Sequence, residues 1–348
     1  MRDLPNLEAT DRGGPTVGIV SVGVYIPETF IAAAEISELS GIPEDVVAHK
    51  MGIVRKPIPG PADHTNAMGL WAAEDALAHS GLSPDEIDLV LCTTEEWKEY
   101  PLWTAGIKLA HDLGARRAWA IDVQMRCATT MAVLKMAKAM MVSDPDINTV
   151  LIAGGYRNGD WIDYRNHRAR FAFSLGAGGG AILLQKGFPR NHLLESAVKV
   201  DGSFSLDLII PAGGTLEPFS AEAVAARRNR LDCPDPEGMK RRLDPVSMDN
   251  FLEVIDTALA KSGCSRDDIG YLNILHLKTS AHRFILSELG LAEEQSYHLA
   301  EFGHIGQQDQ ALSVKLGLES GRLRDGMVMV MVAAGVGYAW SASVVRWG

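Results

Sequence analysis

Residues 76–92 read ALAHSGLSPDEIDLVLC, and residues 258–274 read ALAKSGCSRDDIGYLNI. The two stretches lie 182 residues apart and are identical at eight of seventeen positions. Each has the pattern of a helix end, a Ser-Gly stop, a Ser-x-Asp-acid-Ile turn and a strand. Chance similarity is the alternative, but the shared local pattern favours an internal duplication. We therefore predict two similar halves related by a pseudo-twofold axis.

The apolar runs between these stretches are short and rich in β-branched residues, which is typical of strands. We predict strands at 17–24, 89–94, 149–153, 181–184, 271–275, 327–333 and 341–345. Helical patterns cover 66–79, 128–142 and 248–261. Strands that alternate with helices predict an α/β fold. We place the N-terminal half at 1–188 and the C-terminal half at 189–348, with 217–245 as an exposed excursion from the second half.

Composition excludes several classes of protein. The net charge of −11 disfavours a nucleic-acid binder. The four cysteines form no CxxC pair, so we expect neither a zinc knuckle, nor another metal site, nor a disulfide framework. We see no signal peptide and no run of about 18 apolar residues, so we expect a cytoplasmic protein without a membrane span.

The 182-residue offset carries Cys127 onto Asp309 and Asp122 onto His304. Both segments follow a strand-like stretch and enter a helix rich in small residues. Cys127 precedes an apolar helix, whose positive N-terminal end would favour the thiolate, and Arg126 adds to that field. A small buried core residue is the alternative for this cysteine.

His304 and Asp309 lie in the tract FGHIGQQDQA, residues 302–311. Two glycines bracket the histidine and permit a tight turn at the entrance of a helix. A carboxylate that accepts from one imidazole nitrogen fixes the tautomer and raises the basicity of the other. Cys127, His304 and Asp309 therefore fit a nucleophile, a base and an orienting acid. Asp309 as a simple helix cap is the open alternative.

Two further side chains end predicted strands. His276 follows the strand at 271–275, where a polar ring suits a site, although a core histidine bonded to a backbone carbonyl is the alternative. Glu95 follows the strand at 89–94 and offers a possible general acid or base, although a solvated loop is the simpler interpretation. The glycine-rich tracts at 176–181 and 335–340 precede strands and lack a P-loop context. We expect backbone N–H groups of Cys127, Gly335 and Gly337 to form an oxyanion hole.

Together these segments resemble the thiolase superfamily, most closely the β-ketoacyl-acyl-carrier-protein synthase III group. Cys127 matches the acyl-accepting cysteine of that group, and His276 matches the histidine of its His-Gln-Ala-Asn motif. His304 falls where the group usually has an asparagine. The tract GHIGQQD at 303–309 resembles the Gly-His-x-Gly-x-x-Asp tract of acyltransferases from polyketide pathways. Glu95 lies close to the position of a glutamate in 3-hydroxy-3-methylglutaryl-CoA synthases.

The resemblance implies a five-layered αβαβα fold and a homodimer. It also implies acyl-CoA or acyl-carrier-protein substrates, which carry their own CoA or phosphopantetheine, and no cofactor bound by the chain itself. The chain departs from the group at 277–279, where Leu-Lys-Thr replaces Gln-Ala-Asn. Acyl transfer through an acyl-cysteine is therefore the expected activity. Decarboxylative condensation with a malonyl thioester and a non-catalytic partner subunit are the alternatives.

Overall fold

The computed structural model describes residues 14–348. Its strands are β1 (Val17–Tyr25), β2 (Phe30–Ala32), β3 (Arg55–Pro57), β4 (Leu89–Cys92), β5 (Trp119–Asp122), β6 (Thr149–Tyr156), β7 (Gly178–Lys186), β8 (His192–Val200), β9 (Ile269–Ile274), β10 (Val328–Gly335) and β11 (Ala339–Arg346). Its α-helices are α1 (Ala33–Ser40), α2 (Thr65–Ala78), α3 (Ala105–Leu113), α4 (Thr129–Ser143), α5 (Ala221–Ala225), α6 (Pro236–Leu243), α7 (Ser247–Lys261), α8 (Thr279–Glu288) and α9 (Asp309–Glu319).

The main sheet has the strand order β5-β4-β6-β7-β1-β8-β11-β10-β9, which is nearly symmetric about its middle. In the first half β4 runs parallel to β6, and β7 runs antiparallel to β6 and β1. In the second half β9 runs parallel to β10, and β11 runs antiparallel to β10 and β8. The halves join where Gly18 of β1 pairs with His192 of β8. The predicted pseudo-twofold relation is thus present in the sheet topology.

The repeated stretches adopt the same local structure for the same chemical reason. Gly81 and Gly263 follow α2 and α7 with φ of 73° and 68°, a left-handed conformation that favours glycine. Glu86 then accepts a hydrogen bond from the amide of Ser83, and Asp268 accepts one from the amide of Ser265. These reciprocal caps fix the turns that lead into β4 and β9.

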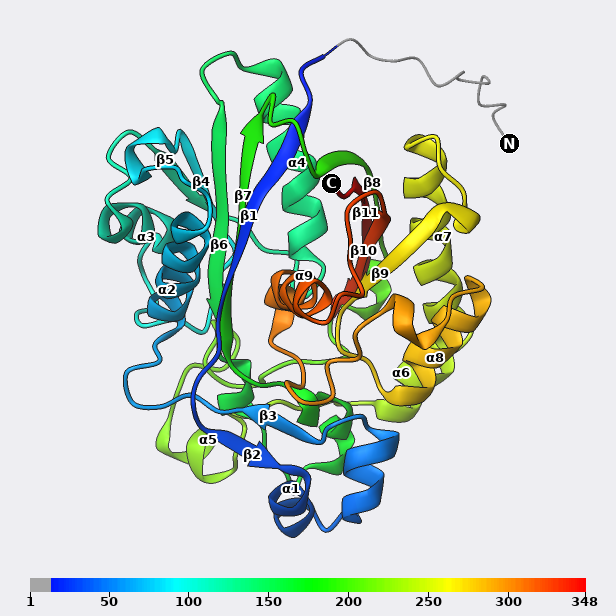
Figure 1. The fold of residues 1–348 in the computed structure, drawn as a ribbon. Coiled ribbons are helices and arrows are strands. Elements are labelled where there is room, and N and C mark those ends of the chain that lie inside the picture. The colour runs from blue at the N-terminus through cyan, green and yellow to red at the C-terminus, as the bar shows by residue number, and fades with distance from the viewer. Residues whose placement is uncertain (1–13) are drawn as a thin grey trace.

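The elements stack in five layers, as Figure 1 shows. Helices α2 and α3 cover the first half of the sheet, α7 and α8 flank the second half, and α4 and α9 lie between the halves. The apolar pattern of α4 runs nearly all round the helix, but only one face is buried, with Met131, Leu134 and Met141 inaccessible to solvent. Met136 and Val142 on the same helix remain partly exposed. Cys127 immediately precedes the N-cap of α4, and Asp309 is the first residue of α9.

Glycines allow α2 to lie directly on the sheet. A Cβ on Gly23 of β1, Gly155 of β6 or Gly179 of β7 would overlap a backbone carbonyl of α2. On the helix itself, a Cβ at Gly69 would lie 2.8 Å from the Cα of Gly154. This close approach fixes the height of the first helical layer above the sheet.

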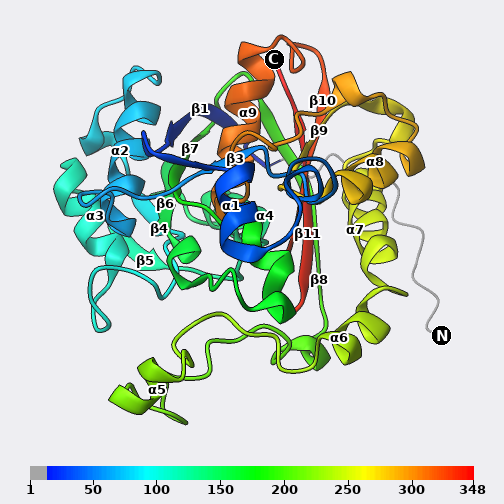
Figure 2. The same cartoon turned by 90° about the horizontal axis from the view of Figure 1, so that it is seen from below.

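Two strands of the main sheet were not predicted. β8 reads HLLESAVKV, where polar residues interrupt the apolar pattern, and β5 has only four residues. The predicted excursion at 217–245 is present and contains α5 and α6. Figure 2 shows the segment around α5 lying apart from the layered body. Within residues 14–348, no helix is long and apolar enough to cross a membrane.

The substitution Gly69→Ala tests the close packing of α2. Alanine favours a helix over glycine, but here its methyl group would press on the backbone of β6. We expect the free energy of unfolding to fall by roughly 1–3 kcal/mol, measured by urea denaturation. Gly214→Ala, where a Cβ meets no atom within 4 Å, is the control and should leave stability unchanged. A Gly69→Ala protein as stable as the wild type would contradict this account.

Candidate active site

Cys127 lies in the turn between β5 and α4, directly before Ala128, the N-cap residue of the helix. Arg126 adopts φ of 52°, a left-handed conformation that turns the chain sharply at this point. The turn is held by Thr129, whose hydroxyl accepts from the amide of Met125 at 2.7 Å. The turn also packs against Gly335 of β10, where an added Cβ would lie 2.8 Å from the Met125 carbonyl oxygen. The half-buried thiol is therefore presented at a fixed position between the two halves.

His304 from the second half faces this thiol. Its Nε2 lies 3.0 Å from Cys127 Sγ, and its Nδ1 lies 2.6 Å from Asp309 Oδ2. The glycines around it have defined functions: Gly303 turns with φ of 58°, and Gly306 with φ of 66° leaves room for the ring of Tyr156. The structure thus brings together the predicted nucleophile, base and acid in one hydrogen-bonded chain.

Asp309 is fully buried and accepts three hydrogen bonds. Oδ2 accepts from the His276 amide at 2.8 Å in addition to the His304 ring, and Oδ1 accepts from the Ile305 amide at 2.8 Å. Asp309 is the first residue of α9, and its carboxylate turns back toward the preceding loop. The helix-cap alternative therefore does not describe this residue, whereas the geometry of an orienting acid does.

The charges around His304 favour its protonated form. Burial alone would lower the pKa of His304, but the negative charges of Asp309 and Cys127 raise it well above the ordinary value. An imidazolium between two acceptors stabilises a thiolate on one side and the carboxylate on the other. Such a pair supplies a nucleophile together with a proton donor for a leaving group.

The His276 ring takes no part in the hydrogen bonds that link Cys127, His304 and Asp309. Its Nε2 bonds to the Gly52 carbonyl oxygen at 2.7 Å, and burial lowers its pKa to about 4. The structure therefore shows the core-histidine alternative, with the ring turned toward the backbone at Gly52. His276 reaches the site through its amide, which binds Asp309.

Glu95 is buried, so the expectation of a solvated loop was wrong for this residue. Its Oε2 accepts from Asn158 at 2.8 Å and lies 3.5 Å from the Arg126 guanidinium. Its Oε1 is buried without a hydrogen-bond partner among residues 14–348. Burial raises the pKa of Glu95 above its ordinary value. Glu96, in contrast, is half exposed and pairs with Arg126, so that much of the charge beside Cys127 is balanced.

Tyr156 at the end of β6 is a site residue that sequence reasoning missed. Its ring lies 6.1 Å from the ring of His304, and it is almost fully buried. Burial raises the pKa of Tyr156 well above its ordinary value, and the negative charge of Cys127 raises it further. The phenol therefore stays neutral. An aromatic residue at the carboxyl end of an apolar strand was the available signal.

Of the two glycines predicted to line an oxyanion hole with Cys127, only Gly335 is seen next to the Cys127 turn. Gly335 ends β10 against the Cys127 turn, as described above, whereas Gly337 lies further along, where its carbonyl accepts from Ser205 at 3.1 Å. The assignment of these amides to an oxyanion hole stays a prediction. Among the described residues, no group of three or more His, Cys, Asp or Glu is arranged to hold a metal ion.

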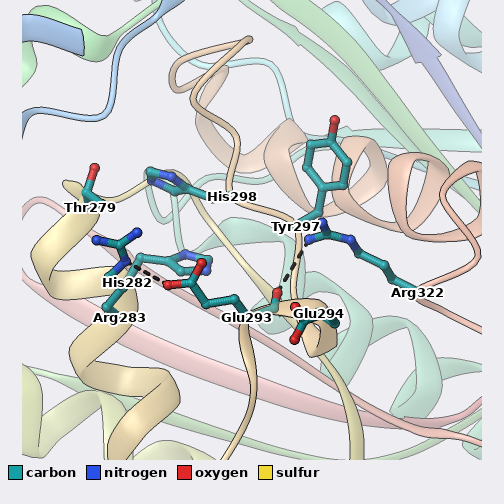
Figure 3. A pocket seen from close by; sticks show the side chains of 8 residues that line it. All are labelled: Thr279, His282, Arg283, Glu293, Glu294, Tyr297, His298 and Arg322. Atoms are coloured by element: carbon teal, nitrogen blue, oxygen red, sulfur yellow. Dashed lines mark hydrogen bonds and ion pairs between the residues drawn. The ribbon is translucent and has the colours of Figure 1, made fainter. Parts of the chain in front are cut away.

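A separate pocket of about 340 Å³ is lined by none of Cys127, His304 and Asp309 and is drawn in Figure 3. His282 and His298 line it, with ring centroids 4.7 Å apart, and His298 in turn stacks on His276 at 5.7 Å. Figure 3 also shows Arg283 joined to Glu293 across the rim. Burial lowers the pKa of His282 to about 3, so the stack is neutral near pH 7.

Comparisons with known proteins show what the chain is similar to. Two family models match, both for 3-oxoacyl-[acyl-carrier-protein] synthase III: one at residues 121–202 and its C-terminal counterpart at 259–347. β-Ketoacyl-[acyl-carrier-protein] synthase III of Syntrophomonas wolfei is 27% identical over 95% of this chain and 98% of its own. The enzyme of the same name from Symbiobacterium thermophilum is 26% identical, with the same coverage.

Solved structures show the same fold. The priming β-ketosynthase of the R1128 polyketide pathway superposes with a TM-score of 0.83 at 22% identity, covering 98% of both chains. OleA of Xanthomonas campestris superposes with a TM-score of 0.80 at 16% identity, covering 95% of this chain and 99% of its own.

Asp309→Asn tests the electrostatics of the chain Cys127–His304–Asp309. Loss of the carboxylate charge removes a cause of the raised pKa of His304, so the imidazolium beside the sulfur becomes less populated. We expect iodoacetamide to alkylate Cys127 at pH 6 at least about tenfold more slowly, measured by mass spectrometry of the Cys127 peptide. Asp249→Asn on the exposed face of α7 is the control. An unchanged rate in Asp309→Asn would refute the arrangement.

The neutral histidine stack predicts acid sensitivity. Histidine in the unfolded chain binds its proton near pH 6.5, but folded His282 binds it only near pH 3. Between these values the unfolded state binds more protons, so the free energy of unfolding falls as pH falls. His282→Gln should make this slope shallower by about 1.4 kcal/mol per pH unit between pH 6 and 4.5. The exposed His49→Gln is the control, and equal slopes in all three proteins would contradict the prediction.

Proposed function

Because the chain is a thiolase-superfamily protein similar to β-ketoacyl-[acyl-carrier-protein] synthase III, we propose that it is an acyltransferase that carries its acyl group on Cys127. The observation that carries the proposal is the unbroken chain from Cys127 Sγ through His304 to Asp309. The donor is an acyl thioester of coenzyme A or of an acyl carrier protein.

In the first half-reaction the Cys127 thiolate attacks the thioester carbonyl carbon, and a tetrahedral oxyanion forms. Backbone N–H groups of Cys127 and of the Gly335–Gly337 turn stabilise that oxyanion. The intermediate then collapses, the bond to the pantetheine sulfur breaks, and the imidazolium of His304 donates its proton to the departing thiolate. The products are acyl-Cys127, a free thiol and a neutral imidazole, which is ready to act as a base.

In the second half-reaction the acceptor is a hydroxyl, amine or thiol. His304 takes its proton as it attacks the acyl-cysteine carbonyl, and the Cys127 thiolate leaves. Asp309 holds the imidazole in the required orientation and stabilises the imidazolium that forms in this step. Two features support a heteroatom acceptor: Asp309 has a defined function in such transfer, and the His276 ring is bound to Gly52 instead of facing the thiol.

Decarboxylative condensation with a malonyl thioester is the second candidate, and the similarity to enzymes named β-ketoacyl-[acyl-carrier-protein] synthase III favours it. Glu95, a buried carboxyl with a raised pKa and one unpartnered oxygen, is suited to move a proton at an acceptor hydroxyl and does not separate the two reactions, because loss of CO₂ generates the carbon nucleophile without a base. The non-catalytic subunit is disfavoured, because a partner that only shapes another site has no use for an intact nucleophile, base and acid.

Carrier-bound donors are proposed from the similarity to enzymes named β-ketoacyl-[acyl-carrier-protein] synthase III. Fixed charges give this proposal little support, because arginines such as Arg168 and Arg242 are paired with Asp232 and Asp207. We further propose a homodimer that works in the cytoplasm, where thioester donors and a reduced Cys127 coexist, with no cofactor held by the chain itself.

Labelling tests the proposal. We expect radiolabelled acyl-CoA to leave label on Cys127 of the wild type and none on Cys127→Ala, with Asp249→Asn as a labelled control. Added alcohols, amines or thiols should then discharge the label as an ester, amide or thioester. A wild-type protein that takes no label from short or long acyl donors would overturn the function.

Malonyl-CoA labelled in its free carboxyl group separates the two reactions. Transfer to a heteroatom discharges acyl-Cys127 without release of labelled CO₂. Release of CO₂ in step with discharge would instead establish condensation as the activity.

A further inference from the structure

Lys56 of β3 is a buried cation whose ammonium faces only backbone oxygens and an aromatic ring. The side chain is 1% exposed, and its Nζ donates to the carbonyl oxygens of Phe173 and Leu175 at 2.7 and 2.6 Å. The third side of the ammonium faces the ring of Tyr164 at 5.3 Å. No carboxylate forms an ion pair with Lys56 within residues 14–348. Burial accordingly lowers the pKa of Lys56 to about 7.

The segment that Lys56 holds is the one that holds His304. The His304 amide donates to the Ser174 carbonyl oxygen at 2.8 Å, and the Gly176 amide donates to the His304 carbonyl oxygen at 2.8 Å. Residues 173–176 thus lie between Lys56 and His304. The carbonyl groups of residues 173 and 175 bond to the lysine, and the peptide groups of residues 174 and 176 bond to His304, which is the alternation seen along a β-strand.

A second contact runs through the stem of the lysine. Gly303 comes so close that a Cβ on it would lie 2.8 Å from the Cβ of Lys56 and 2.6 Å from the Ser174 carbonyl oxygen. Lys56 therefore packs against Gly303, the residue before His304, and also holds the segment that is hydrogen-bonded to His304. Together with Asp309, which fixes the ring, these contacts leave the backbone of His304 little freedom.

We propose that Lys56 is a positioning residue that fixes the backbone of His304 so that Nε2 meets the sulfur of Cys127. The inference rests on the proposed role of His304 as the partner of the thiolate. Without the ammonium, the buried carbonyl oxygens of Phe173 and Leu175 lose their donors, and the segment that pairs with His304 is held less firmly. The effect on Cys127 is transmitted through His304, because Lys56 makes no hydrogen bond to the sulfur.

The test is the pH profile of Cys127 alkylation by iodoacetamide, from pH 5 to pH 9, in the full-length protein. We expect Lys56→Met to react at pH 6 at least about tenfold more slowly than the wild type, with a profile that approaches that of His304→Ala. Lys56→Arg, which keeps a cation and two donors, should restore most of the rate. A folded Lys56→Met protein with the wild-type profile would overturn the proposal.

This readout needs no acyl donor, so its outcome is separate from that of the labelling experiment. Global loss of stability lowers the folded fraction but does not move the profile of the folded protein, which distinguishes positioning from a purely structural role. Should Lys56→Met fail to fold, Lys56→Gln, which keeps an amide donor, is judged by the same profile.

Chemical rescue gives a second measurement. A cavity of about 210 Å³ already adjoins Lys56, bounded by Pro57, Tyr164 and Gly176, and Lys56→Ala would enlarge it. We expect n-propylammonium, which replaces the atoms removed, to restore alkylation of Cys127 at pH 6, whereas 1-propanol should not. A Lys56→Ala protein that loses this reactivity and is not restored by n-propylammonium would contradict a role for the ammonium.

Discussion

The buried carboxylate of Asp309 is the group on which the arrangement of the site depends. A charge without solvent must be fully hydrogen-bonded, and Asp309 meets this requirement with donors from three places: the ring of His304, the amide of His276 and the amide of Ile305. The His276 amide comes from the segment after β9 and the other two donors from the glycine-bracketed loop, whereas Asp309 itself begins α9. One carboxylate therefore ties the second half of the sheet to the central helix and aims the imidazole at Cys127.

Much of this could be predicted from the sequence because the fold is duplicated. The 182-residue offset relates Cys127 to Asp309, and the structure places both residues at the entrances of equivalent central helices. Local chemistry is enough for such positions, since a Ser-Gly stop and a capping turn have the same structure wherever they occur. The α/β fold class, the two similar halves and the Cys–His–Asp set followed from these signals, whereas the five layers were implied by the family resemblance.

The rest depends on contacts between distant residues, which no local pattern encodes. Glu95 is buried because Asn158, 63 residues further on, covers it and bonds to it. The His276 ring turns away because the Gly52 carbonyl, 224 residues away, accepts its hydrogen bond. β8 was missed for a different reason: Ser196 is buried, but it satisfies its hydroxyl against Ser343 on β11, so a polar residue occupies a core position. Lys56 reads as a surface lysine until the two carbonyl oxygens are seen.

The nucleophile and its base are separated by 177 residues and belong to different halves of the chain. During synthesis the first half emerges with its sulfur while the segment that will activate it has not yet been made. An isolated N-terminal half would present a cysteine without its imidazole partner. Activation of this sulfur by His304 therefore requires that the second half has been made and has docked onto the first.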